Sequence, residues 1–144
     1  MFELSDFYDY CKQNQVDVIP FNRLPTPAMT VRDGGRYAVG LNMQRIRTTR
    51  LLRTAAMHEN GHLRTGALHK VVSPYQIVAQ AEHKADADSF RQYLPPEELQ
   101  AAMRAGYTEP WQLAEYFDLE ESYIRKALAY WTECRGVDFN RDPG

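Results

Sequence analysis

The sequence predicts an α+β fold within a single domain, residues 1–144. Three observations predict it: a hairpin pattern in residues 29–41, two long helical segments that follow it, and shorter helical patterns towards the C-terminus. Strands near one end of a chain and helices near the other favour a small sheet packed on helices. We expect an antiparallel sheet. The composition, 44% hydrophobic and 25% charged, is ordinary for a globular protein.

The first forty residues predict a helix, a short strand and a hairpin. Residues 3–14 place apolar side chains at helical spacing, and residues 16–19 alternate briefly as a strand does. Prolines in residues 21–27 indicate a connecting loop. Asp33-Gly34-Gly35 then joins two apolar runs, and glycine supplies the positive φ of tight hairpin turns. One edge of this sheet could bind an extended peptide as an added strand, or the sheet could simply cover the helices.

Two long helices are predicted after the hairpin. Thr48 or Thr49 suits the N-cap of the first, and Gly66 suits its end. Pro74 suits the first turn of the second, which we expect to end near Tyr93. A short helix over residues 97–105 completes a core of residues 1–107.

The first long helix contains His58-Glu59-Asn60-Gly61-His62. Two imidazoles four residues apart lie on one face of a helix, roughly 6 Å apart along its axis, so both can bind one zinc ion at about 2.1 Å. Glu59 lies about 100° further round, where it can take a proton from zinc-bound water. The alternative interpretation is that both histidines are ordinary helix residues.

A catalytic zinc site also needs a third protein ligand and one open position. We expect this ligand to be Glu82 in the second helix. Asp86, one turn on, is placed to accept a hydrogen bond from the non-ligating ring nitrogen of His58 or His62. His83 is the alternative ligand, but it points about 100° away from Glu82. Glu82 and Asp86 could instead belong to a solvated acidic face.

Together these motifs resemble the ImmA/IrrE family of small metallopeptidases. The likeness covers roughly residues 16–131 and is closest to short members carried by phages and mobile elements; it rests on His58-Glu59-Asn60-Gly61-His62, Thr65-Gly66, Glu82-x-x-Ala85-Asp86, Ser89-Phe90 and Leu94-Pro95. The resemblance implies a zincin-like fold with zinc on His58, His62 and Glu82, Glu59 as the base and Asp86 as a partner of the ligands. It also implies cleavage of a helix-turn-helix repressor. Asn60, in place of an apolar residue, and the shifted Phe90 depart from the family pattern.

Other assignments remain open at this stage. A catalytically inactive binding module could contact a repressor or DNA through the C-terminal helices, and a hydrolase of small molecules would have a closed pocket with no free sheet edge. Manganese or iron would also suit imidazole and carboxylate ligands. His69, Tyr75 and Tyr93 are candidates to stabilise an oxyanion, although we favour exposure for His69 and core packing for the two tyrosines.

The C-terminal part predicts a helical pair over residues 108–134 and a frayed tail over residues 135–144. Two helices with a tight turn at Asp118 can form a helix-turn-helix. Glu120 and Glu121 would repel phosphates, however, and the net charge of −2 gives no general attraction for nucleic acid. We therefore expect a packing or substrate-docking role for the pair and no nucleic acid partner, while the family resemblance implies a protein substrate.

Charge, cysteine usage and hydropathy complete the expectations. Arg45, Arg47, Arg50 and Arg53 form a basic cluster that we interpret as a solvated rim or a contact surface for an acidic partner. Cys11 and Cys134 fit no zinc or disulfide spacing, so we expect buried, reduced thiols. No secretion signal is evident, and no apolar run approaches the roughly 18 residues of a membrane span. We expect a cytoplasmic protein without a membrane partner; the sequence does not indicate an oligomeric state.

Overall fold

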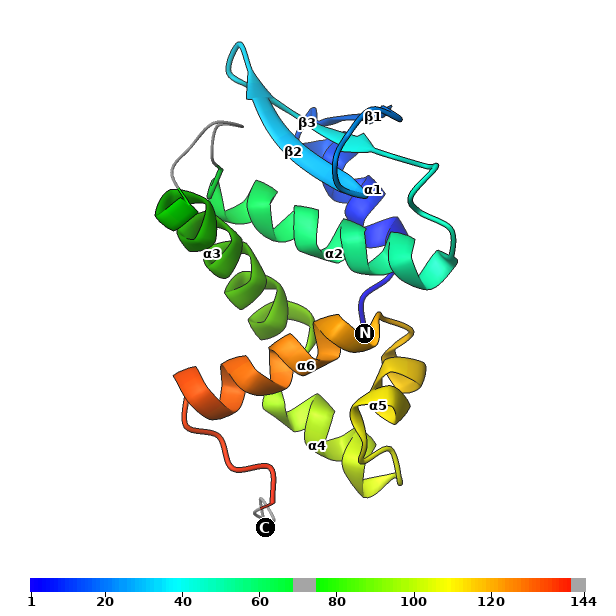
Figure 1. Cartoon of the computed structure of the whole chain (residues 1–144), viewed down its shortest axis with the longest axis vertical. Coiled ribbons are helices and arrows are strands. Elements are labelled where there is room, and N and C mark those ends of the chain that lie inside the picture. Colours follow the sequence, from blue (N-terminus) through cyan, green and yellow to red (C-terminus); the bar gives the residue numbers. More distant parts are fainter. Residues whose placement is uncertain (69–74, 141–144) are drawn as a thin grey trace.

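The computed structural model describes residues 1–68 and 75–140, which form a three-stranded sheet and six α-helices (Figure 1). The elements in chain order are α1 (Leu4–Gln13), β1 (Asp17–Pro20), β2 (Ala28–Asp33), β3 (Arg36–Leu41), α2 (Thr49–Thr65), α3 (Tyr75–Tyr93), α4 (Pro96–Arg104), α5 (Pro110–Phe117) and α6 (Glu121–Ala129), which continues into one π-helical turn, η1 (Tyr130–Cys134). The sheet and α1 lie towards one end of the molecule and α4–α6 towards the other (Figure 1). Over these two ranges, no helix is both long enough and apolar enough to cross a bilayer.

The sheet has the strand order β1-β3-β2 and is mixed. β2 and β3 pair antiparallel through a turn at Gly34 and Gly35, whose φ angles are 57° and 84°, so the predicted hairpin is confirmed. β1, in contrast, pairs parallel with β3 over Asp17 to Pro20. The expectation of a wholly antiparallel sheet was therefore wrong for β1.

The loop between β1 and β2 explains the mixed topology. The Asn42 side-chain amide donates to the carbonyl of Leu24 at 2.9 Å, and the Asn42 backbone N–H donates to the carbonyl of Pro27 at 2.8 Å. These bonds hold the loop across the C-terminal end of β3, so β2 lies on the far side of β3 from β1. As a result β2 is an edge strand of the sheet.

The long helices begin and end close to the predicted residues. Thr48 Oγ1 accepts the N–H of Leu51 at 3.0 Å, and Gly66 closes α2 with a φ of 66°. α3 ends at Tyr93, and α4 begins at Pro96, where the missing N–H of proline is tolerated. The local signals for caps and prolines thus set these boundaries correctly.

The C-terminal helices share one apolar core with the rest of the chain. Ile124 on α6 is fully buried, and Trp131 Nε1 donates to the carbonyl of Leu94 at 2.8 Å. The expected frayed tail is packed in part: the Val137 N–H donates to the carbonyl of Trp131 at 2.9 Å, and the side chains of Val137 and Phe139 lie against the core. Residues 141–144 of that tail lie outside the described residues.

Arg53 ties the N-terminus and the α5–α6 turn to α2. It is only 8% exposed, and its guanidinium donates to the carbonyls of Phe2 at 2.7 Å and Asp118 at 3.0 Å. The Asp118 carboxylate also lies 3.4 Å from Arg53 Nε and 3.3 Å from Arg50 Nε. The interpretation of the basic cluster as a solvated rim was therefore wrong for Arg53, whereas the Arg50 side chain is 38% exposed and the other two arginines of the cluster are exposed.

The two cysteines have different environments. Cys11 is buried in the core, and burial raises the pKa of its thiol to about 11. Cys134 is exposed at the end of η1, so the expectation of two buried thiols was wrong for this residue. Both are free thiols, as the sequence predicted.

Replacing Arg53→Met should lower the free energy of unfolding by about 2–3 kcal/mol, because buried carbonyl oxygens lose their donor. Urea denaturation followed by circular dichroism measures this. Arg47→Met is the matched control: Arg47 belongs to the same cluster but is exposed, so its substitution should change the stability by less than about 0.5 kcal/mol. Equal effects of the two substitutions would contradict the role given to Arg53.

Candidate metal centre

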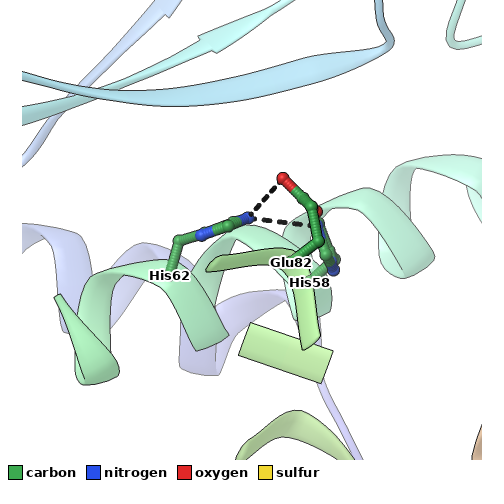
Figure 2. A group of neighbouring side chains, drawn as sticks. All are labelled: His58, His62 and Glu82. Carbon is green, nitrogen blue, oxygen red and sulfur yellow. Dashed lines mark hydrogen bonds and ion pairs between the residues drawn. The ribbon is translucent and has the colours of Figure 1, made fainter. Parts of the chain in front are cut away.

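Three side chains from two helices converge on one point (Figure 2). His58 and His62 come from α2 and Glu82 from α3. His58 Nε2 lies 2.6 Å from Glu82 Oε2, His62 Nε2 lies 3.2 Å from Glu82 Oε1, and the two Nε2 atoms are 3.2 Å apart. One potential ligand atom of each residue lies within 4.8 Å of the others. The structure therefore brings together the three residues that the sequence predicted as ligands.

Gly61 permits this convergence. A Cβ atom at Gly61 would overlap the carbonyl oxygen of Ala85 and would lie 2.6 Å from Ser89 Oγ. Ser89 in turn donates its hydroxyl to the carbonyl of Met57 at 2.9 Å. Only a glycine lets the backbones of α2 and α3 approach this closely, and that approach carries Glu82 to the two imidazoles.

The positions that depart from the ImmA/IrrE pattern are all buried. Asn60 is 1% exposed, and its Oδ1 accepts no hydrogen bond from any of the residues that the structure describes. Ser89 is fully buried against α2, and Phe90 lies in the core. The buried polar side chain of Asn60 is therefore accommodated without a break in α2.

The remaining ring nitrogens of both histidines face hydrogen-bond acceptors. His62 Nδ1 lies 2.6 Å from the carbonyl oxygen of Ala67, which can only accept, so Nδ1 carries the proton. His58 Nδ1 lies 2.7 Å from Asp86 Oδ1, the contact that the sequence predicted for this carboxylate. In their neutral forms both imidazoles therefore direct an Nε2 lone pair at Glu82.

Without a metal, the contacts of both imidazoles with carboxylates favour their protonated forms. Burial lowers the pKa of His58, but its hydrogen bonds with Asp86 and Glu82 outweigh burial and raise the pKa to about 10. Burial lowers the pKa of His62 as well, but the bond to Glu82, the charge of Glu59 and the bond to Ala67 together raise it. Burial raises the pKa of Glu82, whereas bonds from both imidazoles lower it far below its usual range. Two imidazole nitrogens and a carboxylate oxygen in this arrangement fit Zn²⁺ or a similar divalent metal.

Glu59 lies beside the three residues and contacts the sheet. It is 4% exposed, and its Oε2 accepts a hydrogen bond from Thr30 Oγ1 on β2 at 2.8 Å. Thr30 is itself 8% exposed. Sequence reasoning missed Thr30 because the alternation of a strand places a residue on one face without showing what that face covers.

A cleft of about 610 Å³ contains these groups. It is lined by residues of β2, α2, α3 and α6, and β2 passes over the three converging side chains in Figure 2. The residues from β2 and the loop before it are Thr26, Pro27, Ala28, Met29, Thr30 and Val31; those from α6 and its N-cap are Glu120, Ser122, Tyr123 and Lys126. An edge strand therefore borders the candidate metal centre.

Tyr123 is a second cleft residue that sequence reasoning missed. Its ring stands perpendicular to that of His58, with the centroids 6.2 Å apart. Burial, and secondarily the charge of Asp86, raise the pKa of Tyr123 well above its usual value, so its hydroxyl stays protonated. The spacing of apolar residues on α6 indicated a buried face, but it did not indicate that this face contacts α2.

The structure places none of the other predicted candidates, for the oxyanion or for the third ligand, in the described part of the cleft. Tyr93 accepts a hydrogen bond from Arg64 Nη1 at 3.0 Å and packs on Phe2, away from the cleft lining. His69 and the side chain of Tyr75 lie outside the described part of the chain. His83 is exposed on another face of α3 and lines a separate cavity of about 400 Å³, so it is not the third ligand of this cluster.

Comparison of the chain with known protein families, with functionally characterised proteins and with solved structures finds no match. The assignment of a function therefore depends on the residues of the site and on their geometry.

Gly61→Ala should lower the free energy of unfolding by about 1–3 kcal/mol through overpacking, although alanine favours a helix over glycine by about 1 kcal/mol. Zinc affinity, measured by competition with a chromophoric chelator, should fall as Glu82 is pushed away. Ala101→Gly on the exposed face of α4 is the control and should alter stability without altering zinc affinity. If Gly61→Ala left both the free energy of unfolding and the zinc affinity unchanged, the role given to Gly61 in bringing α3 close to α2 would be excluded.

Zinc binding at pH 7.5 should release about one or two protons, because His58, with its pKa raised to about 10, is protonated in the metal-free protein. Calorimetry in buffers of different ionisation enthalpy measures the release. Without metal, the raised pKa stabilises the fold below about pH 6.5, and this stabilisation is lost as the pH rises through about 10. The Asp86→Asn variant should release fewer protons when it binds zinc, since the substitution removes one cause of the raised pKa of His58. Zinc binding by the wild type without proton release would contradict the assignment of His58 as a ligand.

Proposed function

We propose that this chain is a zinc-dependent metallo-endopeptidase in which His58, His62 and Glu82 bind the metal and Glu59 is the general base. The observation that carries this proposal is the convergence of the three ligand atoms beside the buried carboxylate of Glu59, within one cleft. Three protein ligands leave a position for water and substrate, which is typical of catalytic zinc, whereas structural zinc usually has four.

Each residue has a defined task in this proposal. Zinc held by His58, His62 and Glu82 would supply Lewis acidity that polarises the scissile carbonyl and acidifies a water molecule. Glu59 takes the proton of that water and passes it to the leaving nitrogen. Asp86 and the carbonyl of Ala67 keep the imidazoles of His58 and His62 in the tautomers that present Nε2.

The cleft favours an extended peptide as the substrate class. β2 is an edge strand and lines the cleft, so a peptide can add to the sheet through main-chain hydrogen bonds while its scissile bond lies near the metal. A hydrolase of small molecules would need no free strand there. The residues of α6 provide a further surface for substrate side chains, which supports the substrate-docking role expected for the C-terminal helices.

The resemblance to the ImmA/IrrE family supports a narrower proposal. We propose that the substrate is a helix-turn-helix repressor encoded by the same phage or mobile element, cleaved in the cytoplasm. This part depends on the shared motifs, in particular His58-Glu59-Asn60-Gly61-His62 and the downstream Glu82.

The decisive test compares Glu59→Gln with His62→Ala. Glu59→Gln should retain one equivalent of zinc and lose at least about a hundredfold in cleavage rate, because only the base is removed. His62→Ala should lose both zinc and cleavage. Metal content is measured by mass spectrometry, and cleavage with a quenched fluorescent peptide library and with the repressor encoded beside the gene. A Glu59→Gln protein that cleaves normally would exclude Glu59 as the base, whereas a zinc-loaded wild type that cleaves neither substrate would exclude the peptidase and leave the inactive binding module.

A further inference from the structure

We propose that Thr30 is a positioning residue that links the docking of the substrate strand to the orientation of Glu59. This inference rests on the proposed function and deepens it. It follows from two properties of one residue: the hydrogen bond that its side chain makes, and the direction in which its backbone groups point.

The Thr30 hydroxyl holds one oxygen of the Glu59 carboxylate. The bond from Thr30 Oγ1 to Glu59 Oε2 is 2.8 Å long, and both residues are almost fully buried, where a hydrogen bond to a carboxylate is stronger than in water. Threonine is β-branched, so χ1 has few alternatives and the hydroxyl is held in place. Among the described residues, the oxygen of Glu59 that accepts this hydrogen bond is Oε2. The other oxygen, Oε1, is therefore the one that can accept the proton of the reacting water.

The backbone of Thr30 faces the outer edge of β2, where no strand pairs with it in the described part of the chain. In a two-residue hairpin with positive φ at Gly34 and Gly35, the flanking pair Asp33 and Arg36 exchanges both hydrogen bonds, and bonded pairs then alternate along the ladder. By this alternation, residues 29, 31 and 33 bond to β3, whereas residues 28, 30 and 32 direct N–H and C=O outwards. The carbonyl of Ala28 accords with this, since it accepts from the Thr26 hydroxyl at 2.7 Å.

A substrate strand that pairs with the N–H and C=O of Thr30 is therefore held by the same residue that holds the base. Any shift of β2 moves the docked peptide and the Glu59 carboxylate together, which preserves the distance between base and scissile bond. The neighbours of Thr30 in the cleft wall, Met29 and Val31, are apolar. Valine at position 30 would suit a strand and fill the same space, so the buried hydroxyl is explained by its bond to Glu59.

The main test compares Thr30→Val, which removes the hydroxyl, with Thr30→Ser, which keeps it. The zinc-loaded proteins are assayed with the library peptide that the wild type cleaves fastest. Thr30→Val should lower kcat about 10- to 100-fold and leave KM within about threefold, since the backbone of β2 is unchanged. Thr30→Ser should recover most of the activity, and the zinc content of all three should match. A kcat of Thr30→Val within twofold of wild type, or a Thr30→Ser protein as impaired as Thr30→Val, would overturn the inference.

A second measurement uses the metal-free protein and needs no activity. Thr30→Val should lower the melting temperature in the wild-type background and have a clearly smaller effect in a Glu59→Ala background, because the bond is then already absent. Equal shifts in the two backgrounds would overturn the link between Thr30 and Glu59. If the wild type cleaves no peptide, the proposed function fails, and with it the docking half of this inference; an active wild type with no coupling between the two residues overturns this inference alone.

The pairing of the substrate strand with Thr30 is tested separately, by KM values for N-methylated peptides. In a series of peptides with a single N-methyl group at successive positions, methylation of the N–H that meets the Thr30 carbonyl should raise KM at least about tenfold, in wild type and Thr30→Val alike. Methylation one residue to either side should be tolerated, because those N–H groups point away from β2. Uniform tolerance along the peptide would exclude pairing with this strand.

Discussion

The close approach of α3 to α2 at Gly61 is the contact on which the candidate metal centre depends. Helical periodicity alone brings His58 and His62 to one face, but Glu82 reaches them only because no side chain separates the two backbones. The buried bond from Ser89 to the carbonyl of Met57 joins the helices at the same crossing. Two candidate ligands on one helix are thereby joined by a third from its neighbour.

The walls of the cleft depend on residues far from the candidate metal centre. Arg53 holds the α5–α6 turn against α2, and the Glu120 N–H at the start of α6 donates to Thr54 Oγ1 on α2 at 2.9 Å. These bonds keep α6 beside the cleft, where Tyr123 meets the ring of His58. On the opposite side of the chain, Asn42 directs the loop that makes β2 an edge strand. The C-terminal helices and the hairpin therefore act together as the surroundings of one site.

The residues that sequence reasoning identified share a local cause. The hairpin turn, the cap at Thr48 and the stop at Gly66 each depend on a few neighbouring residues, and all three were predicted at the right positions. A hydrogen bond of Asp86 with His58 or His62 was also predicted, since both motifs have the spacing of one helical turn, and the structure forms it with His58. The contacts that sequence reasoning missed depend on packing between distant segments. The bond of Thr30 to Glu59 spans 29 residues, and that of Arg53 to Asp118 spans 65.

By itself, then, the sequence determined the α+β composition, the helix and hairpin boundaries, and the set of imidazoles and carboxylates on each helix, because these follow from dihedral preferences and from periodicity within single elements. The tertiary structure alone decided that β1 runs parallel to β3, that β2 borders the cleft, and that Thr30 and Tyr123 lie beside the candidate site. The physical reason is that these features arise where elements meet, and the direction and distance of such meetings depend on long-range contacts that no local pattern encodes.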